Sequence, residues 1–581
     1  MIVNKISMMI GGEAGAGITR SGFLFAKACL RGGLYVFGTN DYQSLIRGGH
    51  NFYIARADAE EIYSQDNTID LLLALNKETV LLHKDELVPG GGVVYDGEEI
   101  APSDEELGRD SLKLYSVPLR RIVKELESAV IIRNTVALGV AVALLDYDLE
   151  ILNGVIRDTF KRKAAELNVK AAKMGHDYAR EHFAGDFKYR LEKTSSAGKR
   201  KMFLTGNEAV GLGAIRAGCK FYAAYPMTPA TPLLHSLAPL DRKYGMIVIQ
   251  AESEIAAINM VAGASFAGVR AMTATSGGGF CLMSEGLGMT AMTETPAVIM
   301  LAQRPGPSTG LPTYSGQGDL RFAIHASQGE FPRVIIAPGD TEECFYKTVE
   351  AFNLAEKFQI PAILITDKYL VESHGAADPF DQNRIGIDRG LLLIEDEYMG
   401  REEYKRHKFT KDGVSPRAMP GMRGAIVRTS ANEHDESGYT TDDPELTTKM
   451  ADKRFKKLDA LVKDLENYET TKFYGPREAD VTILGWGSTK GPIREALKLL
   501  SKEGLRINYL QIVYLNPFPA ANVQMILKSA KKTVVVENNK TSPLSDLIKE
   551  HLLMTVDYKI LKYDGRPFNP RELSQRIKEV L

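Results

Sequence analysis

The sequence predicts an α/β protein with three doubly wound domains, each built on a parallel sheet with helices on its faces. Short apolar runs alternate along the chain with helical patterns, which is the order that successive βαβ units produce. The chain has 581 residues, and at roughly 150 residues per domain it has room for about three or four domains.

The composition is that of an ordinary globular protein, with 44% hydrophobic and 25% charged residues. The net charge of −2 favours neither nucleic acid nor an anionic membrane as a partner. The first residues read as a strand entering a glycine-rich turn, not as a signal peptide. No apolar run approaches the ~18 to 20 residues of a membrane span, so we expect a cytoplasmic protein that does not enter a membrane.

The cysteines encode no metal or cluster site. The four of them lie far apart in the sequence, without a C-x-x-C pair: Cys29, Cys219, Cys281 and Cys344. Isolated cysteines in apolar settings are typical of buried free thiols in a reducing compartment.

The first predicted domain covers residues 1–191. Its strand-like runs are ISMMI, LYVFG, HNFYIAR, IDLLLAL and GGVVYD, and helical patterns such as ITRSGFLFAKACLRGG lie between them. This alternation favours a parallel sheet. The polar stretch EKTSSAGKRK that follows, residues 192–201, is typical of a linker.

The second predicted domain, residues 202–370, shows the clearest α/β pattern. Its strand candidates are KFYAAY, MIVIQAE, AMTATS, AVIMLAQ, RVIIAP and AILITD. Residues 371–478 are rich in charge, glycine and proline, and we interpret them as a connecting region with one long charged helix. Residues 479–581 predict a smaller α/β domain with strands in ADVTILGWGSTKG, INYLQIVYL and KTVVVENN.

Two glycine-rich stretches of the first domain are candidates for binding an anion. GGEAGAG, residues 11–17, follows a strand and opens a helix, so its backbone N–H groups suit a phosphate. Tight packing without a ligand explains it equally well. SLIRGGHN, residues 44–51, adds the hydroxyl of Ser44 and the guanidinium of Arg47, which suit an anionic ligand or a plain surface turn.

In the second domain, four polar or glycine-rich stretches follow predicted strands. They contain Thr228 in the proline-rich corner YPMTP, Glu254, the run Gly277–Gly279, and Arg304. The carboxyl ends of parallel strands meet at one edge of a sheet, so we expect these stretches to converge on a ligand site. An arginine there is suited to hold a carboxylate through two hydrogen bonds.

Glu252 and Glu254 begin a helix of small apolar residues. Simple helix capping explains two acidic residues at this position. A carboxyl group at the mouth of a buried helix is also a candidate for proton transfer.

Several motifs together resemble one known family. YPMTP is similar to the YPITP signature of 2-oxoacid:ferredoxin oxidoreductase α subunits, and GNEAVGLGAIRAG, ESEIAA, TATSGGGF, QRPGPSTGLPT and GQGDL follow in the same order as in that family. Residues 1–191 resemble its γ domain, which makes the chain look like a fused γ–α subunit. The resemblance implies a γ-type Rossmann-like domain, a thiamine-pyrimidine-type domain and a transketolase C-terminal-like domain.

The resemblance implies an enzyme that uses thiamine diphosphate. It would decarboxylate a 2-oxoacid, pass electrons through a [4Fe-4S] cluster to ferredoxin, and release acyl-CoA and CO2. The chain lacks the GDG motif that binds Mg2+ and diphosphate in thiamine enzymes, and it lacks a cysteine cluster. A β subunit would therefore supply the Mg2+, the diphosphate site and the cluster.

The resemblance also implies roles for individual residues. Glu254, which directly precedes the small-residue helix, matches the glutamate that hydrogen-bonds the cofactor's aminopyrimidine ring. The corner formed by Tyr225 and Pro226 presents Thr228 to the substrate or the cofactor, and Arg304 matches an arginine near the substrate carboxylate. In the γ-type domain, the coenzyme A diphosphate would meet residues of the two glycine-rich stretches: Gly15, Gly17, Ser44 and Arg47.

The substrate and two rival functions stay open. Gene fusion favours 2-oxoglutarate or a broad range of 2-oxoacids, with pyruvate, branched-chain and aryl 2-oxoacids as alternatives. Tyr314 stands where some 2-oxoglutarate-type relatives carry a cationic residue. A non-catalytic assembly subunit is disfavoured by the intact Glu254, Thr228 and Arg304. A nucleotide-binding protein is disfavoured because no Walker lysine or complete G-x-G-x-x-G motif is present.

Overall fold

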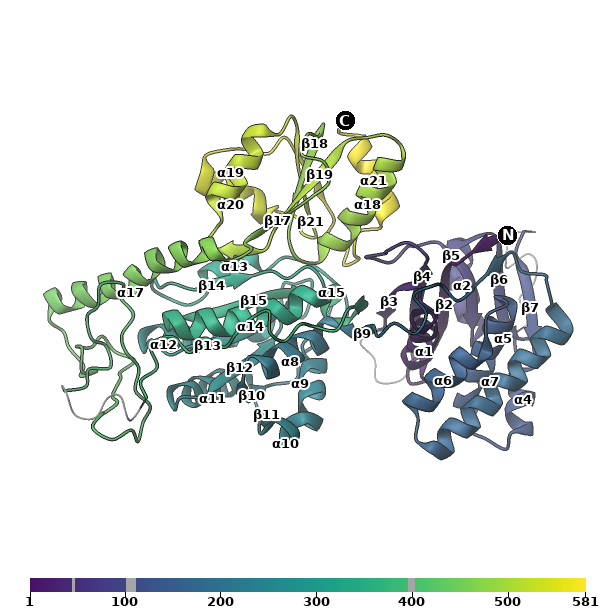
Figure 1. The fold of residues 1–581 in the computed structure, drawn as a ribbon, viewed down its shortest axis with the longest axis horizontal. Coiled ribbons are helices and arrows are strands. Elements are labelled where there is room, and N and C mark those ends of the chain that lie inside the picture. The colour runs from purple at the N-terminus through teal and green to yellow at the C-terminus, as the bar shows by residue number, and fades with distance from the viewer. Residues whose placement is uncertain (44–47, 101–110, 395–402) are drawn as a thin grey trace. The chain divides into compact units, whose positions relative to one another are not determined.

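The computed structural model describes residues 1–43, 48–100, 111–394 and 403–581 (Figure 1). The chain divides into two compact units. The first comprises Met1–Leu204, Ser373–Pro379 and Asn569–Glu572. The second comprises Thr205–Glu372, Phe380–Phe568 and Leu573–Leu581, so it takes in both the second and the third predicted α/β domains. This division by compactness does not follow the predicted domain boundaries, which stay predictions.

An eight-stranded sheet forms the centre of the first unit, in the order β7-β6-β5-β2-β4-β3-β16-β9. Side chains alternate across it as a two-residue period requires: Met8 and Ile10 of β2 face one core, and Met9 between them faces another. The strands are β2 (Lys5–Glu13), β3 (Tyr35–Asp41), β4 (His50–Asp58), β5 (Ile69–Ala74), β6 (Leu87–Asp96), β7 (Lys113–Val117), β9 (Met202–Thr205) and β16 (His374–Ala377).

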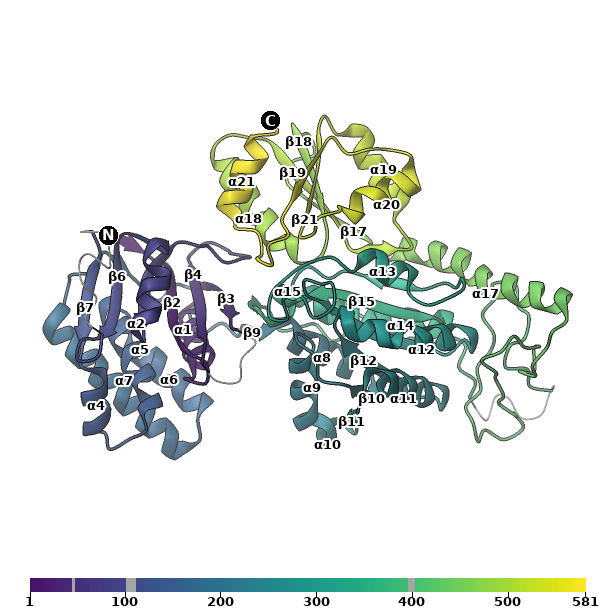
Figure 2. The same cartoon turned by 180° about the vertical axis from the view of Figure 1, so that it is seen from behind.

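Helices cover both faces of this sheet. The longer helices pack on the face of Met8 and Ile10, and the short helix α2 (Lys77–His83) lies on the face of Met9 (Figure 2). The helices of the larger core are α1 (Ile18–Arg31), α4 (Leu119–Glu125), α5 (Arg133–Leu144), α6 (Leu149–Thr159) and α7 (Arg162–Phe183).

The α/β class of this unit is confirmed, but the expectation of a fully parallel sheet is wrong for one half of it. Strands β5, β6 and β7 run parallel to β2, whereas β4 is antiparallel to both β2 and β3. Only residues 42–49 separate β3 from β4. A parallel pair needs a crossover of a dozen or more residues, so this connection permits only an antiparallel pair.

The stretch predicted to be a linker, residues 192–201, hydrogen-bonds to the first unit. Thr194 donates its backbone N–H to Gly32 O at 3.0 Å and its hydroxyl to Gly33 O at 2.9 Å, just beyond the end of α1. The following strand, β9, belongs to the first unit's sheet.

A seven-stranded sheet in the order β11-β10-β12-β13-β15-β14-β20 carries the candidate site in the second unit. All neighbouring pairs are parallel except the edge pair β14–β20. The strands are β10 (Cys219–Ala224), β11 (Ile247–Gln250), β12 (Arg270–Thr275), β13 (Ala297–Gln303), β14 (Val334–Ile336), β15 (Pro361–Asp367) and β20 (Tyr514–Asn516). The helices that connect them include α8 (Gly206–Arg216), α9 (Thr231–Leu237), α11 (Glu254–Phe266), α12 (Gly277–Met292), α13 (Leu320–His325), α14 (Thr341–Phe358) and α15 (Lys368–Glu372).

A five-stranded sheet in the order β17-β19-β18-β21-β22 completes the second unit, together with the long helix α17 (Pro444–Asp464). Its strands are β17 (Thr471–Tyr474), β18 (Val481–Gly485), β19 (Ile507–Ile512), β21 (Thr533–Glu537) and β22 (Tyr558–Leu561). Its helices are α18 (Lys490–Lys502), α19 (Ala520–Ser529), α20 (Pro543–Leu552) and α21 (Pro570–Lys578). Phe280 of α12 and Trp486 after β18 belong to one continuous core, so the two sheets share their interior.

Candidate active site

The polar residues predicted from the second domain do follow neighbouring parallel strands. The corner 225–229 follows β10, Glu254 comes shortly after β11, Gly277 opens α12 after β12, and Arg304 follows β13. Strands β11, β10, β12 and β13 are consecutive in the sheet. The carboxyl ends of these four strands therefore bring the predicted residues to one edge.

Arg304 ties the proline-rich corner to the end of β13. Its guanidinium Nη1 donates to the backbone carbonyl of Thr228 at 2.9 Å. The buried side chain of Asn207 in α8 donates to the carbonyl of Pro229 at 3.0 Å, which holds the corner from the other side. Tyr225 is 39% exposed and Pro226 is half-buried. The corner is thus fixed through its carbonyl groups, and the Thr228 hydroxyl is not used in the Arg304 contact.

Glu254 is the first residue of α11 and is only 3% exposed. Ser253 caps the helix, accepting a hydrogen bond from Ala256 N at 3.2 Å, so the glutamate is not needed for capping. Its Oε1 atom is buried and finds no hydrogen-bond partner among the described residues. Glu252 is exposed. A buried carboxyl oxygen without a partner is costly, which indicates that a ligand atom completes its hydrogen bonding.

The triple glycine after β12 leaves room for carboxyl groups. A Cβ on Gly279 would lie 2.4 Å from Glu254 Oε1, and one on Gly277 would lie 2.5 Å from Asp319 Oδ2. A Cβ on Gly278 would meet no described atom within 4 Å. The first turn of α12 therefore holds one carboxyl group at each outer glycine and an open position between them.

Asp319 is a site residue that the sequence analysis missed. Its motif, GQGDL, was noted only for the resemblance, although an aspartate among glycines after a strand was a usable signal. Burial raises the pKa of Asp319 to about 6, against the opposing effect of the Arg304 guanidinium. Burial in turn lowers the pKa of Arg304, and the Asp319 carboxylate opposes that shift. The charge of each group therefore affects the pKa of the other.

The segment after Arg304 is held to the five-stranded sheet by a buried amide network. Gln317 donates its Nε2 to Trp486 O at 2.9 Å and accepts from Asn538 N at 2.9 Å. Trp486 in turn donates its indole N–H to Glu537 Oε1 at 2.8 Å. This network fixes the loop that connects Arg304 to Asp319.

Tyr314, on the same loop, carries a cation on its ring. The guanidinium carbon of Arg566 lies 3.9 Å from the centre of the Tyr314 ring. Ser315 donates its backbone N–H to Gly565 O at 3.0 Å, which fixes the two segments side by side. Arg566 is exposed and has no carboxylate partner within the described ranges, so it is available to an anion.

The glycine-rich turn of the first unit has the backbone expected of an anion loop. Gly15 and Gly17 have φ angles of 85° and 76°, and a Cβ on Gly15 would meet no described atom within 4 Å. Asn134 supports the turn by donating its Nδ2 to Ala16 O at 2.6 Å. The other two predicted residues of this site, Ser44 and Arg47, lie outside the described residues.

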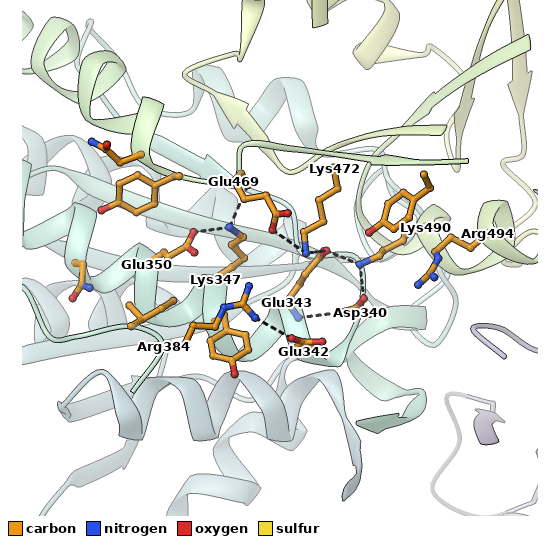
Figure 3. A pocket seen from close by; sticks show the side chains of 16 residues that line it. Asp340, Glu342, Glu343, Lys347, Glu350, Arg384, Glu469, Lys472, Lys490 and Arg494 are labelled. Carbon is orange, nitrogen blue, oxygen red and sulfur yellow. Dashed lines mark hydrogen bonds and ion pairs between the residues drawn. The ribbon is translucent and has the colours of Figure 1, made fainter. Parts of the chain in front are cut away.

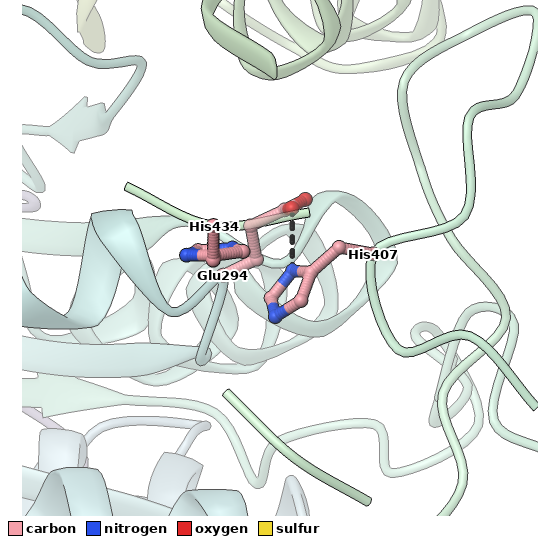
Figure 4. A group of neighbouring side chains, drawn as sticks. All are labelled: Glu294, His407 and His434. Carbon is pink, nitrogen blue, oxygen red and sulfur yellow. Dashed lines mark hydrogen bonds and ion pairs between the residues drawn. The ribbon is translucent and has the colours of Figure 1, made fainter. Parts of the chain in front are cut away.

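A buried cluster of charged and polar side chains joins the connecting region to the segment just after α12, and Figure 4 shows three of its members, Glu294, His407 and His434. Lys453 Nζ lies 2.7 Å and 2.8 Å from the two Glu294 carboxylate oxygens, and Lys457 also pairs with this carboxylate. His407 Nδ1 lies 2.9 Å from Glu294 Oε1, and the His407 and His434 rings are 4.0 Å apart. Glu294, His407 and His434 are metal-ligand types within 4.8 Å of one another. The two lysines already neutralise the carboxylate, so this centre is an anchor of the fold.

Burial and neighbouring charges shift the pKa values of the charged groups in this centre. Burial alone would raise the pKa of Glu294, but Lys457, Lys453 and His407 hold it well below its usual range. Burial lowers the pKa of Lys457 to about 7 and that of His407 to about 3.

A polar cavity of about 420 Å³ lies along α14 (Figure 3). Its walls pair their charges: Lys472 with Glu343 at 3.0 Å, and Arg384 with Glu342 at 3.1 Å. Lys490 also contacts Glu343, at 2.5 Å. Because the charged residues of its walls pair with one another, the cavity does not indicate a particular class of ligand.

Comparison with known proteins places these features in a family. Three family models match: "Pyruvate ferredoxin/flavodoxin oxidoreductase" over residues 7–178, "Pyruvate flavodoxin/ferredoxin oxidoreductase, thiamine diP-bdg" over residues 212–453, and "Pyruvate:ferredoxin oxidoreductase core domain II" over residues 479–573. The chain is 34% identical to the 2-oxoacid:ferredoxin oxidoreductase 2 subunit alpha of Aeropyrum pernix, over 99% of this chain and 98% of that relative. The chain belongs to the 2-oxoacid:ferredoxin oxidoreductase alpha-subunit family.

Two further relatives support this assignment. The 2-oxoglutarate synthase subunit KorA of Methanothermobacter thermautotrophicus is 36% identical over 65% of this chain and 98% of its own length. The structure of 2-oxoglutarate:ferredoxin oxidoreductase from Magnetococcus marinus, with 2-oxoglutarate, coenzyme A and succinyl-CoA bound, has a TM-score of 0.90 and 35% identity, and each chain covers 99% of the other. The predicted family and fold class are confirmed, and the chain is a subunit of an oxidoreductase. No helix among the described residues is long and apolar enough to cross a membrane.

The residues present fit the pyrimidine half of thiamine diphosphate. The orphaned Glu254 Oε1 and the open position at Gly278 lie within residues 212–453, which match the thiamine-binding family model. A buried carboxyl oxygen is the group that an aminopyrimidine ring nitrogen needs, and a glycine turn admits a close ligand.

Proposed function

We propose that this chain holds the pyrimidine half of thiamine diphosphate and the 2-oxoacid carboxylate in an enzyme that converts a 2-oxoacid and coenzyme A to acyl-CoA and CO2, with ferredoxin as electron acceptor. The observation that carries the proposal is the buried, unpartnered Oε1 of Glu254 beside Gly279. When bound, thiamine diphosphate supplies the electron sink for decarboxylation.

The chain's own residues bind and orient the reactants. Glu254 would hold a proton between its carboxyl group and the pyrimidine ring, from a position closed to water. Arg304 would bind the substrate carboxylate with the part of its guanidinium that Thr228 O does not occupy. Tyr225, Pro226 and Thr228 form a corner that would present the Thr228 hydroxyl to the reactants at little entropic cost.

A β subunit would complete the site. The chain has no GDG motif and no cysteine cluster, so the Mg2+, the diphosphate site and the [4Fe-4S] cluster would come from that partner. The outward face of α11 and α12 has the character of an interface, because Ile255 is 53% and Leu282 50% exposed. The γ-type domain would bind the coenzyme A diphosphate at Gly15 and Gly17, together with Ser44 and Arg47.

We propose 2-oxoglutarate or a broad range of 2-oxoacids as substrates. The cation missing at position 314 is supplied from elsewhere in the chain by Arg566, which stacks on Tyr314. A guanidinium on the loop that follows Arg304 suits the second carboxylate of a dicarboxylic 2-oxoacid.

The test is the Glu254→Gln substitution in the complex purified with its partner. We expect ferredoxin reduction with 2-oxoglutarate and coenzyme A to fall by 10²-fold or more, because glutamine keeps the shape but cannot hold the proton. Glu252→Gln, at an exposed position of the same turn, is the matched control. Unchanged activity in Glu254→Gln would contradict the proposed role.

A further inference from the structure

We propose that Asp319 is a second carboxyl group of the active site, which in its neutral form donates a hydrogen bond to the carboxylate of the bound 2-oxoacid. The proposal rests on the proposed function at one point, the binding of that carboxylate by Arg304. It assigns to this chain a substrate-binding residue in addition to Thr228 and Arg304.

The backbone of Asp319 is fixed to the strand that ends at Arg304. Its N–H donates to Gln303 Oε1 at 2.9 Å. Gln303 is fully buried and donates its Nε2 to Thr366 O at 3.0 Å in the neighbouring strand β15. Since Gln303 directly precedes Arg304, Asp319 is held next to the end of β13 that presents the guanidinium.

The side chain of Asp319 turns away from its own helix. Asp319 occupies the N-cap position of α13, where aspartate ordinarily accepts a hydrogen bond from the helix. Here no side-chain cap forms, and Oδ2 is buried without a hydrogen-bond partner in the described part of the chain. It instead lies against Gly277, where a Cβ would come within 2.5 Å of it. An aspartate that leaves its capping bond unmade has its carboxyl group available to the site.

Two carboxyl groups with unpartnered oxygens thus flank one turn of α12. Glu254 Oε1 lies at Gly279 and Asp319 Oδ2 at Gly277. The position between them, at Gly278, is open. The two orphaned oxygens point to two polar contacts with the reactants, one at each end of the turn.

The titratable or charged groups around Asp319 come from three elements packed near it. Arg304 faces it from the end of β13, Cys281 from the first turns of α12, and Glu254 lies beyond Gly279 at the start of α11. Burial raises the pKa of Asp319 to about 6, and Arg304 opposes this effect. The carboxyl group therefore changes its charge around pH 6.

Binding of a 2-oxoacid places a carboxylate beside this group. An ionised Asp319 would repel the substrate carboxylate, and both anions would compete for Arg304. A protonated Asp319 instead donates its O–H to a substrate carboxylate oxygen. Binding therefore takes up one proton from solvent, and no covalent bond is made or broken.

The experiment is titration calorimetry of the complex with its partner subunit, prepared without thiamine diphosphate. 2-Oxoglutarate is titrated at pH 7 in two buffers of different ionisation enthalpy, which measures proton uptake directly. We expect uptake approaching one proton per substrate in the unsubstituted protein and close to none in Asp319→Asn. Over pH 6 to 8 the affinity should weaken by more than about tenfold in the unsubstituted protein, since only the protonated fraction binds well. It should change by less than about twofold in Asp319→Asn, whose side chain is always neutral.

Asp443→Asn is the matched control, because Asp443 caps α17 in the ordinary way, accepting from Leu446 N at 2.7 Å. It should keep the proton uptake of the unsubstituted protein. Binding without proton uptake in the unsubstituted protein, or with unchanged uptake in Asp319→Asn, overturns the role of Asp319 and leaves the proposed function standing. Absence of 2-oxoacid binding in the unsubstituted protein overturns both.

Discussion

Two of the three glycines at the start of α12, Gly277 and Gly279, decide how closely two carboxyl groups approach the helix. Glycine is unfavourable inside a helix, by roughly 0.5–1 kcal/mol relative to alanine. Gly277 and Gly279 accept this cost because Asp319 and Glu254 occupy the space of their missing side chains. Glycine at these positions is thus required by the site and not by a turn.

Gly279→Ala should reduce activity without unfolding the protein. The added methyl group would lie 2.4 Å from Glu254 Oε1 and 2.0 Å from Thr275 Oγ1, so the carboxylate has to move. Helix propensity offsets part of the strain, so we expect the melting temperature to change little while 2-oxoacid turnover falls at least tenfold. Gly263→Ala in α11, where a Cβ would meet no described atom within 4 Å, measures the propensity gain alone. Equal turnover in Gly279→Ala and the unsubstituted protein would show that the carboxylate position is not critical.

Arg566→Gln should change substrate preference more than overall activity. The guanidinium 3.9 Å from the Tyr314 ring is replaced by a shorter, neutral amide, which removes the cation proposed for the second carboxylate. We expect kcat/KM for 2-oxoglutarate to fall about tenfold or more relative to that for pyruvate, a difference of about 1.4 kcal/mol. Tyr314→Phe keeps the ring under Arg566 and should keep the preference. A ratio that stays constant in Arg566→Gln would assign the second carboxylate to another group.

At the scale of elements, the long helix α17 is held to the rest of the second unit by buried ion pairs. Lys453 and Lys457 of α17 form ion pairs with the carboxylate of Glu294. All three side chains are at most 1% exposed. Burying these charges is costly, and their mutual pairing offsets the cost. The carboxylate is therefore the group on which the attachment of the connecting region depends.

Glu294→Gln should destabilise the second unit, and more at low pH than at high pH. Removing the carboxylate leaves two buried ammonium groups unpaired, at a cost of about 3–5 kcal/mol. Burial lowers the pKa of Lys457 to about 7 in the unsubstituted protein, and the Glu294 carboxylate opposes this shift, so loss of the carboxylate lowers that pKa further. The unfolded chain, with an ordinary lysine pKa near 10.4, therefore binds more protons than the folded variant above about pH 7. The free energy of unfolding of the variant should therefore rise as pH increases from about 7 towards 10.

Urea unfolding of Glu294→Gln at pH 6.5 and pH 9 measures this effect. The exposed pair of Lys449 and Glu445 on the same helix provides the control, since Glu445→Gln should leave the free energy of unfolding close to that of the unsubstituted protein at either pH. A free energy of unfolding of Glu294→Gln that does not rise between pH 6.5 and pH 9 would mean that the lysines do not carry the charge we assign to them.

At the scale of the whole molecule, the two sheets of the second unit are joined by a strand and by a core. β20 comes from the C-terminal part of the chain but pairs antiparallel with β14 at the edge of the seven-stranded sheet. Phe280, Trp486 and Val535 lie in one hydrophobic core. The site edge of one sheet is therefore stabilised in part by residues of the other.

Val535→Ala should weaken both sheets of the second unit together. Val535 is fully buried in β21 and belongs to the shared core. Loss of its two γ-methyl groups costs about 2 kcal/mol. We expect hydrogen exchange to show the same loss of protection in β12 and β13 as in β18, because one core unfolds as one cooperative unit. Protection lost in β18 alone would show that the two sheets unfold separately.

The sequence by itself predicted the α/β class, the positions of most strands, and that Thr228, Glu254 and Arg304 follow strands of one sheet; their roles stay predictions. Apolar periodicity and the polar residues that follow strands are local signals, and parallel strands necessarily bring their ends to one edge. The antiparallel half of the first sheet was also readable from its short connection, had loop length been considered against the crossover rule.

Only the tertiary structure decided which distant side chains meet. Gly277 and Asp319, Tyr314 and Arg566, and Glu294 and Lys457 are brought together by packing between elements, over separations that carry no sequence period. The sequence likewise places Asp319 at a helix N-cap, but it does not show that the side chain makes no capping hydrogen bond to that helix. The physical reason is that hydrophobic patterning specifies which face of an element is buried, whereas the partner of each polar group depends on the three-dimensional closure of the whole core.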